Sequence, residues 1–93
     1  MRDRFKNTIT FELYCGIARK GMPSDIVRVA RRKLQQVVRS VKLTDLSVPP
    51  NNRLEALKGN RKGQYSIRVN DKWRICFVWS GHDAQEIEFV DYH

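Results

Sequence analysis

The stretch that decides the fold is residues 64–79, which read Gln-Tyr-Ser-Ile-Arg-Val-Asn-Asp-Lys-Trp-Arg-Ile-Cys-Phe-Val-Trp. Apolar and polar residues alternate on both sides of the polar segment 70–72. Successive side chains of a β-strand point to opposite faces, so this alternation is typical of two half-buried strands. Asn70 and Asp71 tolerate the left-handed backbone conformations that tight turns need. The stretch therefore predicts a β-hairpin closed by residues 70–72.

The register of the hairpin follows from the length of its loop. With residues 70–72 in the loop, Val69 lies opposite Trp73. The next pairs are Ile67 with Ile75 and Tyr65 with Phe77. A turn one residue tighter would put polar residues opposite aromatic ones along the whole strand. The same register sets Arg68 opposite Arg74 on the other face, where like charges repel, so we expect carboxylates or an anionic ligand beside them.

Further strands are expected on both sides of the hairpin. Residues 53–58 have the pattern of a first strand, and a basic loop with two glycines, residues 58–63, follows it. A polar turn over residues 80–83 precedes a last strand from Glu86 to His93. Residues 4–6 are predicted to form one more short strand. The C-terminal half is therefore predicted to form a small, mainly antiparallel, twisted sheet.

Helical periodicity marks the N-terminal half. Asn7 or Thr8 can cap a first helix, whose apolar residues recur at helical spacing up to Ala18, with Gly21 as the stop signal. A second helix is predicted over residues 23–41, with a proline in its first turn. Its apolar stripe consists of Ile26, Ala30, Leu34, Val37 and Val41. Two helices followed by short strands predict a single α+β domain with both helices on one face of the sheet.

The outer face of the second helix is strongly basic. It carries Arg28, Arg31, Arg32, Lys33 and Arg39, and no acidic residue follows Asp25 within the helix. Such a face is often only solvated, but a surface of one sign also suits RNA phosphates or an acidic segment of a partner protein. Arg28 and Arg32 are our candidate phosphate contacts on this helix.

The size and charge of the chain narrow its function. Its 93 residues suit one small domain, and its net charge of +8 favours an anionic partner, nucleic acid ahead of an acidic protein. Cys15 and Cys76 are too few for a disulfide framework or a metal site. We expect both to be buried or half-buried thiols of a reduced, cytoplasmic protein. No signal peptide or membrane span is expected.

The common enzyme signatures are missing from the sequence. It contains no glycine-rich phosphate fingerprint, no metal-ligand spacing and no serine nucleophile motif, and only His82 and His93 supply imidazoles. Basic residues, carboxylates and a terminal histidine suit cleavage of RNA without a metal or another cofactor. RNA supplies its own nucleophile, the 2′-hydroxyl, so the protein need only move protons and stabilise charge on the phosphorane.

Three segments together resemble the HigB-type toxins of the RelE/ParE superfamily. They are Leu-Lys-Gly-Asn-Arg at 57–61, residues 64–77 of the hairpin, and Val-Asp-Tyr-His at 90–93. The likeness is close over the C-terminal half and loose over the helical half. It implies a RelE-like fold and a toxin that inhibits translation by cleaving mRNA in the ribosomal A site, leaving a 2′,3′-cyclic phosphate. It also implies a HigA-like helix-turn-helix antitoxin, with operator DNA bound only through the antitoxin complex.

The resemblance also assigns the active site. The matching positions are Lys58, Arg74, Asp91, Tyr92 and His93. Arg61, Lys62 and Arg68 join the two helix arginines as further candidate contacts to RNA phosphates. A fixed guanidinium at Arg74 would clamp the phosphate, and its alternative is a cross-strand ion pair with a glutamate such as Glu86 or Glu88. Lys58 would stabilise the phosphate or act as base, Tyr92 would stack on a nucleobase, and Asp91 would orient His93.

This sequence departs from the family at Glu55, where HigB-type toxins can carry a histidine three residues before the lysine. The change leaves His93 as the candidate imidazole, suited to protonating the leaving 5′-oxygen. Glu55 is then either the general base or a structural partner of Arg74. The rival hypothesis is a nucleic-acid-binding module without catalysis, or a gyrase-directed toxin of the ParE branch. The discriminating feature is the set of Lys58, Arg74 and His93, which a pure nucleic-acid binder does not need.

Overall fold

The predicted hairpin is present in the computed structural model, which describes residues 1–91. Strands β2 (Gln64–Arg68) and β3 (Trp73–Trp79) are antiparallel. Their pairs include Tyr65 with Phe77, Ile67 with Ile75 and Arg68 with Arg74, and the amide of Val69 donates to the carbonyl of Trp73 at 2.9 Å. The Oδ1 of Asn70 accepts from the amides of Lys72 and Trp73 at 2.9 and 2.8 Å, which closes the loop. The predicted register is confirmed.

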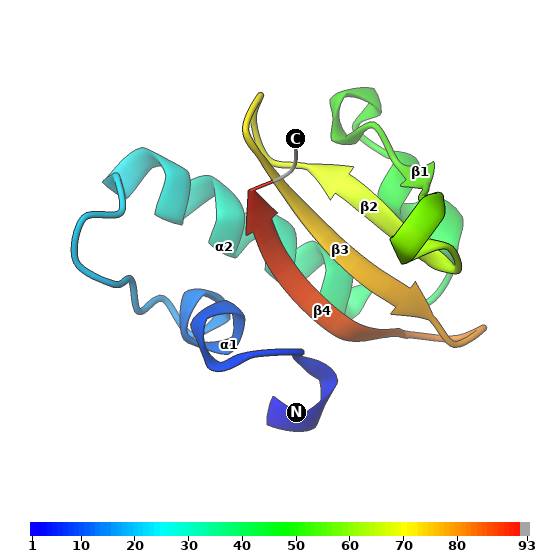
Figure 1. Cartoon of the computed structure of the whole chain (residues 1–93), viewed down its shortest axis with the longest axis horizontal. Coiled ribbons are helices and arrows are strands. Elements are labelled where there is room, and N and C mark those ends of the chain that lie inside the picture. The colour runs from blue at the N-terminus through cyan, green and yellow to red at the C-terminus, as the bar shows by residue number, and fades with distance from the viewer. Residues whose placement is uncertain (92–93) are drawn as a thin grey trace.

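Two outer strands complete an antiparallel sheet of order β1-β2-β3-β4 (Figure 1). Strand β1 (Glu55–Ala56) is much shorter than the predicted strand over residues 53–58. Arg53 adopts the left-handed conformation, with φ of 48°, so it cannot be part of an extended strand. Strand β4 (Ala84–Asp91) begins two residues before the predicted start at Glu86 and ends at the limit of the described residues.

Two helices cover one face of this sheet. Helix α1 (Thr8–Tyr14) begins as predicted, because the side chain of Asn7 accepts a hydrogen bond from the amide of Thr10 at 3.0 Å. It ends at Tyr14 rather than near Ala18, and the glycine that follows its end is Gly16, with φ of 88°. The prediction that Gly21 stops this helix was therefore wrong.

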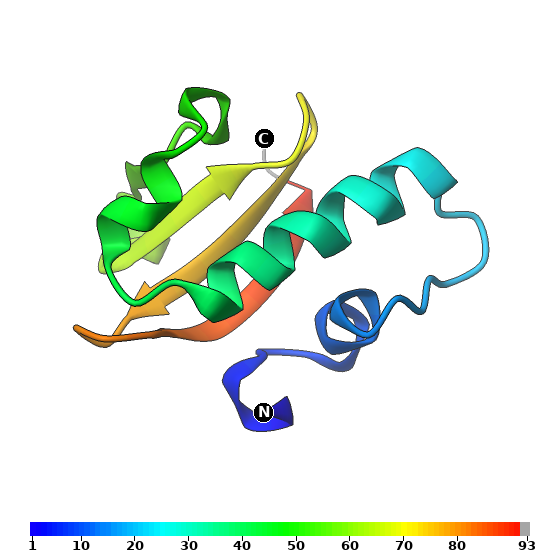
Figure 2. The same ribbon diagram turned by 180° about the vertical axis from the view of Figure 1, so that it is seen from behind.

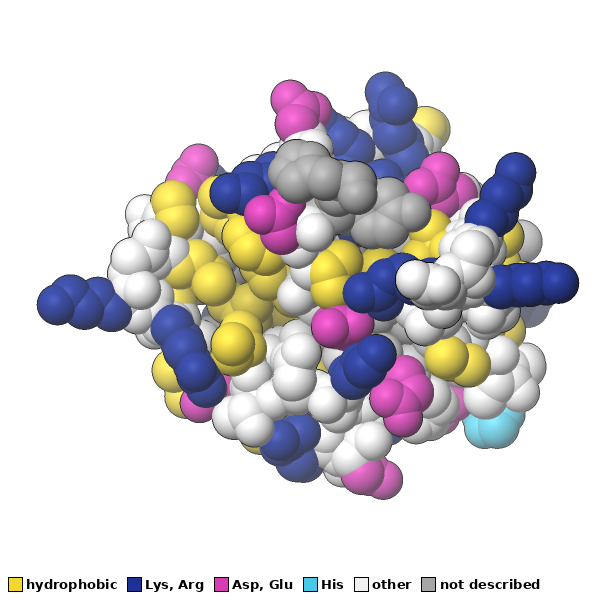
Figure 3. Space-filling view, viewed as in Figure 1, with side chains coloured by type: hydrophobic (Ala, Val, Ile, Leu, Met, Phe, Trp, Pro, Cys, Tyr) yellow, Lys and Arg dark blue, Asp and Glu magenta, His cyan; other side chains and the backbone are white. Residues whose placement is uncertain are grey.

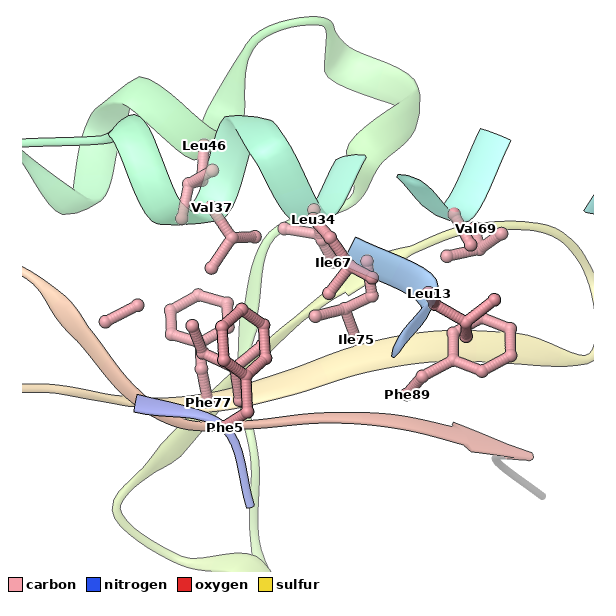
Figure 4. Packing of buried hydrophobic residues seen from close by; sticks show 13 residues of the cluster. Phe5, Leu13, Leu34, Val37, Leu46, Ile67, Val69, Ile75, Phe77 and Phe89 are labelled. Carbon is pink, nitrogen blue, oxygen red and sulfur yellow. The ribbon is translucent and has the colours of Figure 1, made fainter. Parts of the chain in front are cut away.

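Helix α2 (Ser24–Arg39) is slightly shorter at both ends than the predicted helix over residues 23–41. Ala30, Leu34 and Val37 of its apolar stripe are fully buried, whereas Val41 lies beyond the helix and is exposed. Figure 2 shows α2 lying across the back of the sheet. In Figure 4, Leu34 and Val37 of this helix are directed at Ile67, Ile75 and Phe77 of the strands. The predicted α+β architecture is confirmed. Neither α1 nor α2 covers the opposite face, which we call the open face.

The N-terminal segment lies along the outer edge of β4. Residues 2–4 form a single 3-10 turn, and Phe5 makes one isolated parallel bridge to Ile87. The amide of Lys6 donates to the carbonyl of Ile87 at 2.9 Å, and the amide of Phe89 donates to Thr10 Oγ1 at 2.9 Å. The strand predicted over residues 4–6 is therefore only a bridge.

Two polar expectations are corrected by the fold. Lys33, expected on the exposed face of α2, is buried. Cys15, expected to be buried or half-buried, is exposed at the C-terminal end of α1, while Cys76 is buried as expected. No helix formed by residues 1–91 has both the length and the hydropathy needed to cross a membrane.

Candidate active site

The open face of the sheet brings charged residues of all four strands together. The strand register places Glu55, Ser66, Cys76 and Glu88 in one row across the sheet. Arg68 and Arg74 form the adjacent row, two residues further along β2. Figure 3 shows this side of the molecule with Lys and Arg side chains mixed among Asp and Glu. The arrangement is therefore a network of paired charges rather than a purely basic surface.

Arg74 is the most firmly held cation of the open face. Its Nε donates to Ser66 Oγ at 2.8 Å and its Nη2 donates to the carbonyl of Arg53, also at 2.8 Å. The same Nη2 lies 3.5 Å from Oε1 of Glu55. The side chain of Arg74 is 12% exposed, and that of Glu55 is 52% exposed. These contacts fix the orientation of the guanidinium, and a fixed guanidinium is suited to bind a phosphate.

Carboxylates accompany both arginines of the cross-strand pair, as the sequence led us to expect. Asp71 forms an ion pair with Arg68, and Glu55 forms one with Arg74. Arg74 thus pairs with the glutamate on β1, and Glu88 instead contacts Arg61 and Lys6. These pairs offset the repulsion that two facing guanidinium groups would otherwise cause.

Arg61 extends over the middle of the open face. It ends the 3-10 turn Gly59–Arg61, and its Nη1 donates to Gln64 Oε1 at 3.1 Å and to Glu88 Oε1 at 3.2 Å. Cys76 lies in the same row of the sheet as Glu88 and is fully buried. Burial raises the pKa of the Cys76 thiol, so the group stays protonated and is a poor nucleophile at neutral pH.

Lys58 lies toward the other end of the open face from Arg74. It directly follows Leu57, whose amide donates to the carbonyl of Gln64 at 2.9 Å. Gln64 and Arg68 are four residues apart on β2, which corresponds to about 13 Å along the strand. Lys58 and Lys62 are both exposed beside this end. This spacing separates the backbone positions at the two ends, whereas the guanidinium of Arg74 reaches back to Ser66 and to the carbonyl of Arg53, in the direction of Lys58.

Asp91 is at the far end of β4, opposite Trp73. Its Oδ2 lies 3.6 Å from Nζ of Lys72. By register, Asp91 shares the sheet face of Trp73, whose ring stacks on Phe89 at 4.6 Å between centroids, whereas Arg74 is on the open face. The fold places Asp91 and Arg74 near the same end of the sheet but by register on opposite faces. The predicted site residues Tyr92 and His93 lie outside the described residues.

The two candidate contacts on α2, Arg28 and Arg32, are exposed and belong to the helical layer rather than to the open face. Lys33 differs from them, because its Nζ donates to the carbonyl of Arg68 at 2.6 Å. Burial, followed by repulsion from Arg32, Arg68 and Arg74, lowers the pKa of Lys33. This lysine ties α2 to the strand that carries Arg68, and it is not a surface contact.

Sequence reasoning missed the roles of three residues in this arrangement. They are Ser66, which holds Arg74, Glu88, which holds Arg61, and Lys33, which bonds to β2. The positions of Ser66 and Glu88 could have been predicted, because extending the predicted register over all four strands places both residues in the same row as Glu55. Nothing in the sequence indicated that Lys33 is buried, because a lysine on a basic helix face has the same sequence pattern whether its aliphatic stem is buried or exposed.

A family model described as a RelE-like toxin of the type II toxin–antitoxin system HigB matches residues 3–93. Toxin HigB-1 of Vibrio cholerae is 45% identical over 58 residues, which cover 62% of this chain and 61% of that protein. An uncharacterised protein of Haemophilus influenzae is 30% identical over 99% of this chain and 91% of its own length. Endoribonuclease HigB of Proteus vulgaris is 33% identical over 78% of each chain. The resemblance of the sequence is thereby confirmed, and the chain belongs to the HigB-like family of RelE-like toxins of type II toxin–antitoxin systems.

Proposed function

We propose that the chain is a metal-independent endoribonuclease that cleaves mRNA in the ribosomal A site, in the cytoplasm, and so inhibits translation. The family membership, and the relative from Proteus vulgaris that is named an endoribonuclease, support this class of activity. The observation that carries it is Arg74, fixed by Ser66 and Arg53 on the open face with a carboxylate beside it. A toxin of this family has an antitoxin partner. We propose a HigA-like helix-turn-helix protein, which alone brings the complex to operator DNA.

The proposed reaction uses the substrate's own nucleophile. The 2′-hydroxyl loses its proton, its oxygen bonds to the adjacent phosphorus, and the bond from phosphorus to the 5′-oxygen breaks. The 5′-oxygen takes up a proton, so the products are a 2′,3′-cyclic phosphate and a 5′-hydroxyl. Arg74 stabilises the charge that develops on the phosphorane.

The proton transfers are assigned by position. Glu55 is the proposed base, because its carboxylate lies beside Arg74, where the scissile phosphate would bind. His93 is the proposed acid, and Tyr92 stacks on a flanking base. Asp91 is given no step, because by register it lies on the sheet face opposite Arg74. The phosphates of the RNA on either side of the cleaved bond are contacted by four basic residues, namely Lys58, Arg61, Lys62 and Arg68.

Replacing Glu55 with glutamine is expected to lower the cleavage rate by about 10²- to 10⁴-fold, the usual contribution of a general base. Histidine at the same position should restore part of the rate, because an imidazole can also accept the proton. The measurement is single-turnover cleavage of translated mRNA by purified variants. Asp71→Asn is the matched control, since it removes the carboxylate of the other cross-strand arginine. Equal, small losses in Glu55→Gln and Asp71→Asn would show that Glu55 is only a charge partner.

Deleting His93 is expected to abolish growth inhibition while leaving antitoxin binding intact, because the deletion removes the proposed acid and no buried side chain among residues 1–91. Growth of cells expressing each variant and a pull-down with the antitoxin measure the two properties. The melting temperature should change little. If the shortened chain stops growth as well as the parent does, His93 is a bystander and another group protonates the 5′-oxygen.

A further inference from the structure

Arg53 has an uncommon backbone conformation shortly before β1. Its φ is 48° and its ψ is 55°, which lie in the left-handed region. Residues other than glycine seldom adopt this region; asparagine does so more readily than most, and β-branched residues do so least. Among residues 1–91, Glu86 is the other non-glycine residue with a positive φ. Such conformations persist where the surrounding structure holds them, and they are frequent at functional sites.

The carbonyl group of Arg53 contacts the candidate active site. Its oxygen accepts a hydrogen bond from Nη2 of Arg74 at 2.8 Å, although the two residues are 21 positions apart in the sequence. The bond crosses β2, which lies between β1 and β3 in the sheet (Figure 1). Rotating the backbone of residue 53 out of the left-handed region would turn this carbonyl away from Arg74. Arg53 is exposed, so the hold on Arg74 comes from its main chain and not from its own guanidinium.

The conformation of Arg53 is supported from the preceding residue, because Asn52 is anchored beneath the connector between α2 and β1. Asn52 is fully buried. Its Nδ2 donates to the carbonyls of Leu46 and Val48 at 3.2 and 3.3 Å. The same Nδ2 donates to Oε1 of Gln36 on α2 at 3.2 Å. The main chain therefore enters residue 53 from a fixed point that is bonded both to the connector and to the helix.

The segment that follows Arg53 supplies a second group beside Arg74. Glu55, two residues later, pairs in the sheet with Ser66, whose Oγ accepts from Nε of Arg74 at 2.8 Å. The carboxylate of Glu55 lies 3.5 Å from Nη2 of the same arginine. Two of the groups around this guanidinium thus lie within residues 53–55. The turn of the chain at Arg53 determines how both of them face Arg74.

We propose that Arg53 is a positioning residue, whose left-handed main chain holds the guanidinium of Arg74 in the orientation that binds the scissile phosphate. The side chain of Arg53 is not needed for this role. The role rests on the proposed function, because the orientation of Arg74 affects cleavage only if Arg74 contacts the phosphate. Since Arg53 is exposed, its side chain can be exchanged without removing a group from the core.

The test compares Arg53→Asn with Arg53→Val, two variants that lose the same positive charge. Asparagine tolerates the left-handed conformation, whereas valine, which is branched at Cβ, strongly disfavours it. Cleavage of translated mRNA by Arg53→Val should be slower than by Arg53→Asn by up to about 10²-fold, the loss that a misplacement of about 1 Å can cause. The difference should appear in kcat and not in KM, because both variants lose any contact that the guanidinium makes to RNA. Arg53→Gly should also cleave faster than Arg53→Val.

A second measurement does not require cleavage. The Nε–H group of Arg74, observed by NMR, should exchange its hydrogen slowly with water in the parent chain and in Arg53→Asn, because it is bonded to Ser66. Exchange should be faster in Arg53→Val, where the guanidinium loses its bond to the carbonyl of residue 53. Glu86→Val is the matched control, since it puts the same side chain at the left-handed position on β4. A parent chain that cuts no RNA but shows this response at Arg74 would refute the proposed function and leave the positioning role standing.

Three results would overturn the positioning role. If the parent chain cleaves RNA and Arg53→Asn and Arg53→Val cleave it at equal rates, the backbone conformation at position 53 does not matter. If Arg53→Val slows cleavage further in an Arg74→Ala background, Arg53 does not act through Arg74. If Glu86→Val releases Arg74 as Arg53→Val does, the response reports only a general loss of stability. Should Arg53→Val fail to fold in denaturant unfolding, Arg53→Ala replaces it, because alanine disfavours the left-handed conformation without a branched Cβ.

Discussion

Arg74→Ala is expected to lower the rate of mRNA cleavage by about 10²- to 10³-fold, and with it to remove growth inhibition. This is the usual loss when one preorganised donor to a transition-state oxyanion is removed. Arg74 qualifies as such a donor because Ser66 and the carbonyl of Arg53 hold its guanidinium before any substrate arrives. Arg74→Lys keeps the charge but loses the planar fork, so it should recover only part of the rate.

The variant must also be shown to fold. Removing Arg74 leaves Ser66 and the Arg53 carbonyl without a partner that they have in the native chain, at a cost of about 1–3 kcal/mol in the free energy of unfolding. Denaturant unfolding measures this cost, and antitoxin binding reports an intact surface. Arg39→Ala, at the exposed end of α2, is the charge-matched control. Full toxicity of Arg74→Ala, or its failure to fold, would exclude Arg74 as the phosphate clamp.

Cleavage is expected to be rapid during translation and slow or undetectable on the same RNA free in solution. The candidate groups come from β1, from β3 and from the turn between β1 and β2, so a flexible RNA strand seldom meets all of them in a reactive geometry. Positioning a substrate can be equivalent to an effective concentration of about 10⁵ M or more. A ribosome that holds the mRNA extended would supply that positioning.

The comparison needs one transcript in two settings. Single-turnover cleavage is followed on the labelled transcript alone and on the same transcript in a purified translation system, at equal toxin concentration. Arg74→Ala in both settings reports contaminating nucleases. Equal rates on free and translated RNA would show that the chain positions its substrate without help, and the dependence on the ribosome would be refuted.

The hairpin was predictable to the residue because its alternation has only one register that keeps aromatic residues off the polar face. From that register the opposed arginines followed, and so did the need for carboxylates near them. Helix α2 was equally clear, since Leu34 and Val37 repeat at helical spacing. These features are local, because several residues of one segment repeat the same alternation or the same helical spacing.

Other features depend on contacts between distant segments. The end of α1 was misplaced because Ile17 continues the apolar spacing, yet its side chain is 57% exposed once Gly16 has turned the chain. The burial of Lys33 depends on where the carbonyl of Arg68 lies, which no helical pattern reveals. In the candidate site, Arg74 followed from its position on the polar face and from the resemblance. A pairing with Arg74 was one of two roles expected for Glu55, and the pairing of β1 with β2 shows that the two side chains do meet.

The short hydrogen-bonded contact of the N-terminal segment with β4 has a consequence for how this protein can associate. Exposed sheet edges invite strand addition from other chains. Here Lys6 and Thr10 already occupy backbone groups of Ile87 and Phe89 on one edge, and β1 offers only two residues on the other. A partner that extended the sheet at β4 would first have to displace the N-terminal segment. The same cover protects this edge of the sheet from edge-to-edge aggregation.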